Sequence, residues 1–169
     1  MGGELFFSKG WFEGRLMAMT FQAQYRAVAG SCADTESCTM DWGEKSRRNM
    51  YGFSTVMTPH DWVLMTELLS TPTIGYDNAY AASASVGHHF GNWLPMMTYS
   101  IYEQSIINIE PNIINNERHS TTSASLRYDL TPSSDVKLQF DHWISYGGNY
   151  FPSIYGNSNM LTLAYDLVF

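Results

Sequence analysis

The chain ends with the stretch Leu161–Phe169, which reads LTLAYDLVF. Apolar side chains occupy every second position of this stretch: Leu161, Leu163, Tyr165, Leu167 and Phe169. Because successive side chains of a strand point to opposite faces, this period of two predicts a β-strand with one apolar face. Such a strand is either embedded in a membrane or buried at the edge of a soluble β-sandwich, and the remainder of the sequence has to distinguish the two.

The composition combines many aromatic residues with few charged ones. Aromatic and charged residues each make up 15% of the 169 residues, and the mean hydropathy is −0.22. No run approaches the roughly 18 consecutive apolar residues that a membrane-spanning helix needs. A transmembrane β-barrel has this profile, because its strands alternate and their hydropathy averages out. The net charge of −7 argues against nucleic acid as a partner, since nucleic acid calls for a basic face.

The same alternation recurs along the chain and predicts about nine strands. The predicted strands are residues 4–8, 11–28, 46–57, 62–69, 80–90, 93–104, 119–130, 135–146 and 161–169. Short connections at 9–10, 58–61, 91–92 and 131–134 alternate with long ones at 29–45, 70–78, 103–118 and 147–157. The isoleucines of 103–118 leave open whether the neighbouring strands extend, or whether this segment packs on the rim or folds inward. Outer-membrane barrels sort their connections in this way, whereas a soluble sandwich has no reason to do so.

Three segments carry a resemblance to a known family. They are the terminal LTLAYDLVF, the segment VGHHFGNWLPMMTY (86–99) and the segment SASLRYDLTPSSDVKLQFDHW (123–143). Together they resemble the strands and hairpins of porin-like bacterial outer-membrane proteins. The resemblance implies an all-β, antiparallel, up-and-down transmembrane β-barrel in contact with outer-membrane lipid and lipopolysaccharide. It further implies that Leu161, Leu163, Tyr165, Leu167 and Phe169 form the signal read by the barrel-assembly machinery, and it leaves open whether copies form a homo-oligomer.

The strand count suggests how much of a barrel is present. Single-chain bacterial barrels have even strand numbers, and nine is odd. No secretory signal peptide is visible at the start of the sequence. We therefore expect residues 1–169 to be a single β-barrel domain that is the C-terminal segment of a larger barrel of about 16–18 strands. The alternative is a complete eight-stranded barrel with a structural or adhesion role, if residues 4–8 form no strand.

The alternation also assigns faces. In a barrel the apolar face of each strand points to lipid and the Ser, Thr and Gln face points to the lumen. For the strand at 11–28, this assigns Met17, Met19 and Phe21 to the lipid side. The expected pore-lining charges are Arg26, Arg48, Glu67, Arg127, Asp129, Lys137, Asp141 and Asp166. Their signs are mixed, so they predict neither anion nor cation selectivity, and the expected function is passive diffusion of small hydrophilic solutes or ions.

Cysteine and histidine residues give little sign of other chemistry. Cys32 and Cys38 lie in the polar stretch GSCADTESC and suit a disulfide in an oxidising compartment, although free or metal-bound thiols remain an alternative. His88 and His89 are adjacent, so they point to opposite faces of a strand and cannot chelate one ion. No nucleophile and base are placed together. We therefore expect no cofactor, no metal site and no enzymatic activity.

Overall fold

The computed structural model of the 169-residue chain describes residues 1–23, 26–29, 39–42, 45–72, 77–107, 114–146 and 156–168. These residues form strands and turns, and among them there is no helix long and apolar enough to cross a membrane. The strands are β1 (Gly2–Lys9), β2 (Phe12–Ala23), β3 (Arg26–Ala29), β4 (Thr39–Trp42), β5 (Ser46–Met57), β6 (Trp62–Thr71), β7 (Asp77–His88), β8 (Trp93–Ile107), β9 (Ile114–Thr131), β10 (Ser134–Ser145) and β11 (Ser158–Leu167).

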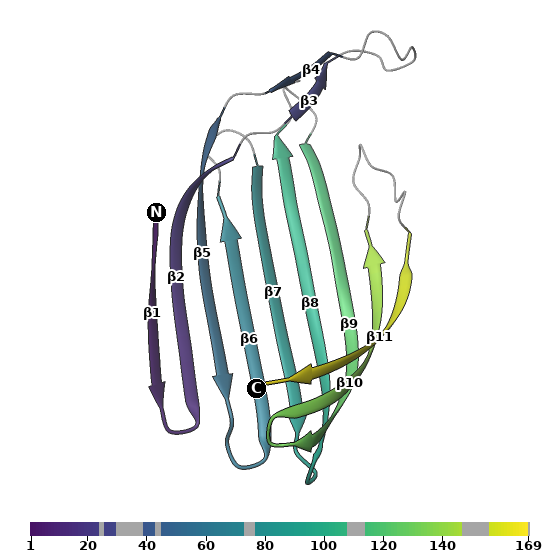
Figure 1. The fold of residues 1–169 in the computed structure, drawn as a ribbon. Helices are drawn as coiled ribbons and strands as arrows, with labels where there is room; N and C mark the ends of the chain where they lie inside the picture. Colours follow the sequence, from purple (N-terminus) through teal and green to yellow (C-terminus); the bar gives the residue numbers. More distant parts are fainter. Residues whose placement is uncertain are drawn as a thin grey trace.

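Nine of these strands form one antiparallel up-and-down sheet, in the order β1-β2-β5-β6-β7-β8-β9-β10-β11 (Figure 1). Each strand pairs with its neighbours along the sheet, and β3 pairs separately with β4. The predicted all-β class and the nine sheet strands are thus confirmed. The sheet is not closed into a barrel: β1 and β11 each pair on one side only. Because the strand number is odd, these two edge strands run in the same direction.

The turns are set by residues that tolerate a left-handed backbone. Gly10 and Gly91 have φ of 61°, and a residue with a Cβ is strained at such a value. His60 adopts φ of 56° in the turn at 58–61, where Pro59 precedes it. The four turns at 10–11, 58–61, 89–92 and 132–133 all lie at one end of the sheet (Figure 1).

Two predicted boundaries are wrong. The strand predicted at 11–28 ends at Ala23, and residues 26–29 belong to the separate hairpin β3-β4, because they pair with residues 39–42 inside the predicted long loop. The loop predicted at 103–118 shrinks to 108–113, because β8 extends to Ile107 and β9 begins at Ile114. The isoleucine-rich segment therefore extends the strands in part. The connections 72–76 and 108–113 are only slightly longer than the turns. The difference in length between the connections at the two ends of the sheet is therefore smaller than the sequence indicated.

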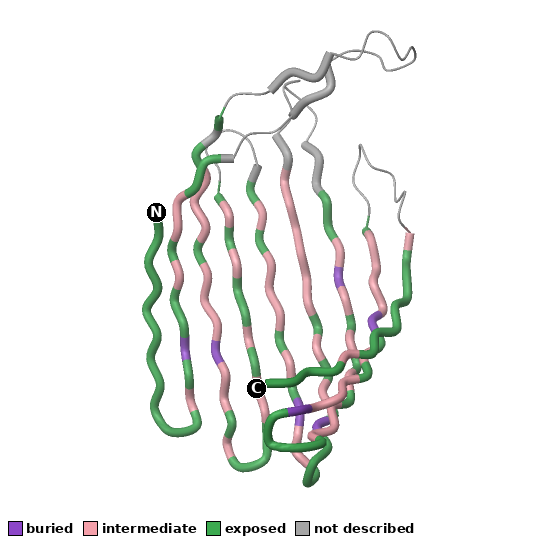
Figure 2. Tube along the Cα trace, in the orientation of Figure 1, coloured by how far each residue is buried: buried purple, intermediate pink, exposed green. Residues whose placement is uncertain are grey.

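The sheet is a single layer without a hydrophobic core. Among the described residues, Leu94 is the one buried hydrophobic side chain, and none of the large side chains is fully buried (Figure 2). Large apolar residues such as Leu161, Leu163 and Tyr165 are more than half exposed. A sheet in water normally buries its apolar face against a second layer. The described residues supply no such layer.

Aromatic and glycine residues pack directly across the first hairpin. Phe7 stands opposite Gly14, and a Cβ at Gly14 would collide with the Phe7 ring. The ring therefore occupies the space that a side chain would fill, which is a known way to stabilise a glycine in a strand.

Candidate functional site: the polar face of the sheet

The pairing register divides the side chains between two faces of quite different chemistry. We call the polar face the one that carries Glu67 on β6, Ser83 on β7, Ser100 on β8, Thr121 on β9 and Trp143 on β10. These five residues stand directly opposite one another in a row across five strands. The neighbouring row adds Ser85, Thr98, Ser123 and Asp141, of which Ser85 and Thr98 share a hydrogen bond of 2.8 Å between their hydroxyls. The centre of the polar face is therefore lined with hydroxyl groups and carboxylates.

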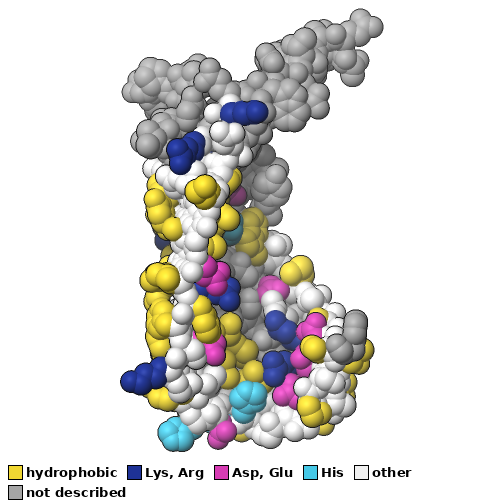
Figure 3. Space-filling view, turned by 60° about the vertical axis from the view of Figure 1, so that its left-hand side comes forward, with side chains coloured by type: hydrophobic (Ala, Val, Ile, Leu, Met, Phe, Trp, Pro, Cys, Tyr) yellow, Lys and Arg dark blue, Asp and Glu magenta, His cyan; other side chains and the backbone are white. Residues whose placement is uncertain are grey.

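The sheet curls around the polar face. Strands β10 and β11 swing forward, so that the C-terminal end of β11 lies in front of the middle strands (Figure 1). A view from the β1 edge shows charged side chains inside the resulting hollow and hydrophobic side chains on the outer side of the strand wall (Figure 3). The polar face is thus the inner, concave side.

Seven of the eight charges predicted to line a pore share the polar face. They are Arg48, Glu67, Arg127, Asp129, Lys137, Asp141 and Asp166. The eighth, Arg26, lies in β3 outside the large sheet, and its side chain is not described. Its assignment depended on a strand that continued past residue 25, and β2 ends at Ala23. Whether the seven line a pore stays a prediction.

Three carboxylates form a row at the end of the polar face near the short turns. Asp135 on β10 stands opposite Asp129 on one side and Asp166 on the other. One oxygen of Asp135 is buried without a hydrogen-bond partner among the described residues. These residues line a groove of about 430 Å³, which also includes Asn92 and Ser133.

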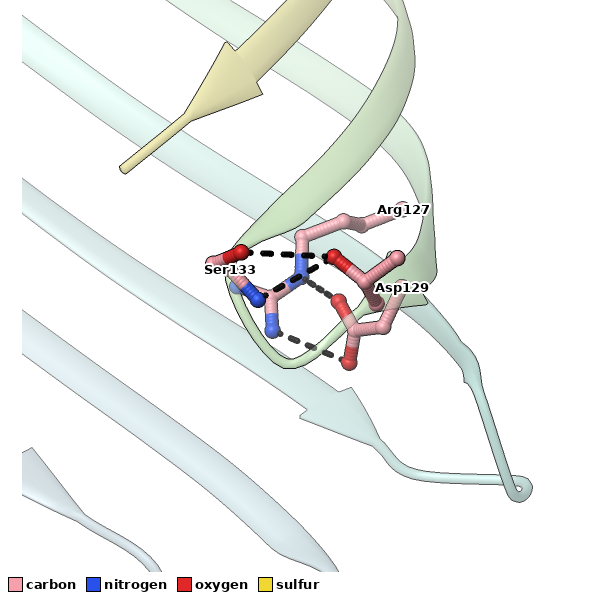
Figure 4. Close-up of polar contacts among 4 residues, drawn as sticks. Arg127, Asp129 and Ser133 are labelled. Atoms are coloured by element: carbon pink, nitrogen blue, oxygen red, sulfur yellow. Dashed lines mark hydrogen bonds and ion pairs between the residues drawn. The ribbon is translucent and has the colours of Figure 1, made fainter. Parts of the chain in front are cut away.

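Arg127 partly neutralises this row. Its Nε lies 2.8 Å from Asp129 Oδ1, and its Nη2 donates to Asp129 Oδ2 at 3.3 Å (Figure 4). Beside this pair, the Ser133 N–H donates to Thr131 Oγ1 at 3.3 Å and fixes the β9-β10 turn. Both charged side chains are about one-third exposed, so the ion pair contributes at most about 1 kcal/mol to stability.

Asp141 is the buried carboxylate of the polar face. It is 6% exposed, and both of its oxygens accept hydrogen bonds from Gln139 Nε2, at 2.8 and 3.1 Å. Burial of a charged group is tolerated only with such partners. Gln139 therefore fixes the position of the Asp141 carboxyl group at mid-height on the wall.

An aromatic cluster marks the opposite end of the polar face. The His119 ring stacks on Tyr102 with 4.7 Å between centroids and lies 5.4 Å from Trp143. The Tyr102 hydroxyl donates to Gln104 Oε1 at 2.6 Å. A cavity of about 280 Å³ extends from this cluster to Glu67. Polar solutes on this face would thus meet hydroxyls, carboxylates and rings within a short distance.

The other face, which we call the apolar face, carries most of the large exposed hydrophobic side chains, and several of its polar groups bond to one another. Thr55 and Thr66 share a hydrogen bond of 2.7 Å, and Ser120 lies 3.2 Å from the Tyr146 hydroxyl. An apolar groove of about 800 Å³ crosses β1, β2, β5, β6 and β7 on this face. Its walls are mostly apolar side chains: Leu5, Leu16, Ala18, Tyr51, Phe53, Leu68, Tyr80 and Ala82.

The prediction that Met17, Met19 and Phe21 lie on the face opposite the charged residues is wrong. In β2 these three residues share the polar face with Arg15, while Leu16 and Ala18 share the apolar face with Tyr51 and Phe53. The prediction rested on the apolar side chains at residues 17–21 and passed over Glu13 and Arg15, which share the face of Met17 and mark it as the polar one. Met17 instead packs over Gly52, beside Leu69.

Sequence reasoning missed several charges of the polar face. Asp135 was not predicted to lie on the polar face. It is separated from Lys137 and Asp141 by an even number of positions along β10, so alternation places all three side chains on the same face. Glu4, Glu13, Arg15 and Glu117 also lie on this face. Glu4 pairs with Arg15 at 3.2 Å. Glu117 has the same alternation as His119 and Arg127 along β9, whereas the face of Glu4 follows only from its cross-strand pairing with Met17.

Other predicted residues give a mixed outcome. Leu161, Leu163, Tyr165 and Leu167 lie together on the apolar face of β11, opposite β10. Phe169 lies outside the described residues, as do Cys32 and Cys38, so the assembly signal and the disulfide stay predictions. Within the described ranges, no three His, Cys, Asp or Glu side chains are arranged to hold a metal ion.

Comparison with known proteins identified no relative of this chain. No protein-family model matches the sequence, no curated protein matches it, and no solved structure matches the fold. The function has to be argued from the two faces of the sheet.

Proposed function

We propose that this chain forms part of the wall of a porin-like β-barrel in the bacterial outer membrane, through which small hydrophilic solutes or ions diffuse passively. The observation that carries the proposal is the division of one nine-stranded sheet into an exposed apolar face and a hydroxyl- and charge-lined concave face. In a barrel wall, lipid covers the first face and water fills the second.

The exposure of the apolar side chains on the described strands supports a lipid environment. The exposed apolar face extends across all nine strands, far beyond the few hundred Å² that a monomeric soluble protein usually leaves uncovered. Polar groups on this face bond to one another, as Thr55 does to Thr66, which limits the cost of placing them in hydrocarbon. The apolar groove on the same face suits a hydrocarbon chain.

The strand directions indicate what a closed barrel would require. Self-closure would pair β1 with β11 in parallel, since both run the same way. A fully antiparallel barrel needs an odd number of further strands between these edges, and barrels of 16–18 strands leave an aqueous channel. The proposal therefore includes strands beyond the nine of this sheet. The alternative of a complete eight-stranded barrel fits less well, because β1 pairs with β2 over its whole length and makes nine.

Solute uptake tests the proposal. The natural protein that carries this chain is purified from outer membranes in detergent and reconstituted into liposomes that contain a large impermeant polymer. We expect the liposomes to swell in iso-osmotic solutions of small sugars and amino acids, and not in solutions of sugars too large to pass. A protein that fractionates without detergent, or liposomes that do not swell in any small solute, would overturn the proposal.

A further inference from the structure

The charges on the two faces of the sheet are of opposite net sign. Among the strand residues with described side chains, the polar face carries eight carboxylates, Glu4, Glu13, Glu67, Glu117, Asp129, Asp135, Asp141 and Asp166, and four cations, Arg15, Arg48, Arg127 and Lys137, which leaves a net charge of −4. The strand residues of the apolar face with described side chains carry three cations, Lys9, Arg47 and Arg118, and one carboxylate, Glu103, a net charge of +2.

The negative charges of the polar face are distributed along its height. Asp129, Asp135 and Asp166 form the row near the short turns, whereas Asp141 and Glu67 lie further along the strands. Arg127 neutralises only Asp129 directly, and Arg15 pairs with Glu4 near the β1 edge. A positively charged solute that moves along the wall therefore meets carboxylates at successive levels.

The curvature of the sheet strengthens this effect. Charges of one sign on a concave, low-dielectric wall focus their field into the hollow and raise the local concentration of counter-ions. Rings of Asp and Glu side chains are a recurrent basis of cation preference in channels. The groove at the Asp129, Asp135 and Asp166 row has a volume of about 430 Å³.

We propose that the polar face of this sheet makes the pore selective for cations over anions, with Asp135 and Asp166 as main contributors at the short-turn end. This inference rests on the proposed pore and specifies which solutes it favours. The sequence alone predicted neither cation nor anion selectivity, because the expected pore-lining charges have mixed signs. The register adds which charges share the concave face.

The test is the reversal potential of single channels in planar lipid bilayers with a KCl gradient. For the natural protein we expect a potential of the sign that reports K⁺ as more permeant than Cl⁻. The preference should be larger at 0.1 M than at 1 M salt, because the Debye length falls from about 10 Å to about 3 Å. The double variant Asp135→Asn/Asp166→Asn should lower the permeability ratio, and Glu67→Gln should lower it less.

The matched control is Glu103→Gln, which removes one negative charge from the apolar face. It should leave the permeability ratio unchanged. Channels without cation preference, or an equal change in Glu103→Gln and Asp135→Asn/Asp166→Asn, would overturn the inference and leave the pore intact. An unchanged ratio in both polar-face variants would also overturn it. A protein that gives no channels overturns the pore itself, and the cation preference with it.

Discussion

Strands β9 and β2 lie in the same sheet and follow the same register rule, yet they sort their side chains differently. In β9, Ser123, Ser125 and Arg127 occupy the polar face and Leu126 the apolar face. In β2, Met17 and its neighbours occupy the polar face although they are as apolar as the residues on the other side. The difference shows that alternation in a sequence identifies a face only where the side chains on the two faces differ in polarity.

The largest expected loss of stability comes from placing a charge on the apolar face of β9. Leu126→Lys places a charge on the apolar face and should reduce the free energy of unfolding in lipid by about 2–4 kcal/mol. Ser125→Lys, one residue away on the polar face, should change it by less than about 0.5 kcal/mol. Urea unfolding of the protein from lipid vesicles measures both. Equal losses would mean that the two faces of β9 meet the same medium.

The next experiment compares the two faces of β2, where apolar side chains lie on both sides. Leu16→Lys lies on the apolar face and should again cost about 2–4 kcal/mol. Met17→Lys lies on the polar face and should cost about 1 kcal/mol through lost packing against Gly52 and Leu69. The same unfolding assay applies. If Met17→Lys proves the more harmful change, the register of β2 given above is incorrect.

This comparison explains how much of the molecule the sequence could predict. Strand β10 was located to within one residue at each end, because it alternates polar and apolar residues over many positions, whereas β9 begins five residues before its predicted start. The end of β2 and the hairpin β3-β4 were missed, since nothing local in residues 11–28 marks where one ladder ends and another begins. The faces of β2 were reversed for the reason given above.

The candidate site was predictable in part for the same reason. Glu67, Arg127, Lys137 and Asp141 stand in strands with a clear alternation, so their common face could be anticipated. The row of Asp129, Asp135 and Asp166 could not, because it depends on which residues of three strands stand opposite one another. A tight turn fixes the register of β9 and β10, but no such turn joins β10 to β11, so the sequence does not fix their pairing.

A smaller effect is expected from the buried carboxylate on β10. Gln139→Leu removes the two hydrogen bonds to Asp141, and an unsatisfied buried carboxylate should lower the free energy of unfolding by about 1.5 kcal/mol. The control is Thr162→Leu, which lies opposite Gln139 on the exposed strand β11 and should be nearly neutral. Chemical denaturation in detergent compares the two variants, and a neutral Gln139→Leu would show that water satisfies Asp141.

The smallest effect concerns the first hairpin. Gly14→Ala should displace the Phe7 ring from its preferred rotamer and cost about 1 kcal/mol. Gly3→Ala, whose Cβ would meet no atom within 4 Å, should cost nothing by comparison. Thermal or urea unfolding can resolve the difference. In a Phe7→Ala background the penalty of Gly14→Ala should vanish, and its persistence would point to backbone strain.

The open β1 edge of the sheet has a consequence for aggregation. In water, copies of the chain can approach in any orientation, so two β1 edges, each a row of unpaired backbone groups beside exposed Leu5 and Phe7, can join as an antiparallel ladder. In a membrane that every copy enters from the same side, a β1 strand runs parallel to every other β1, and that ladder cannot form. For the proposed membrane protein, the edge of β1 therefore most needs protection from a second copy in the period before insertion.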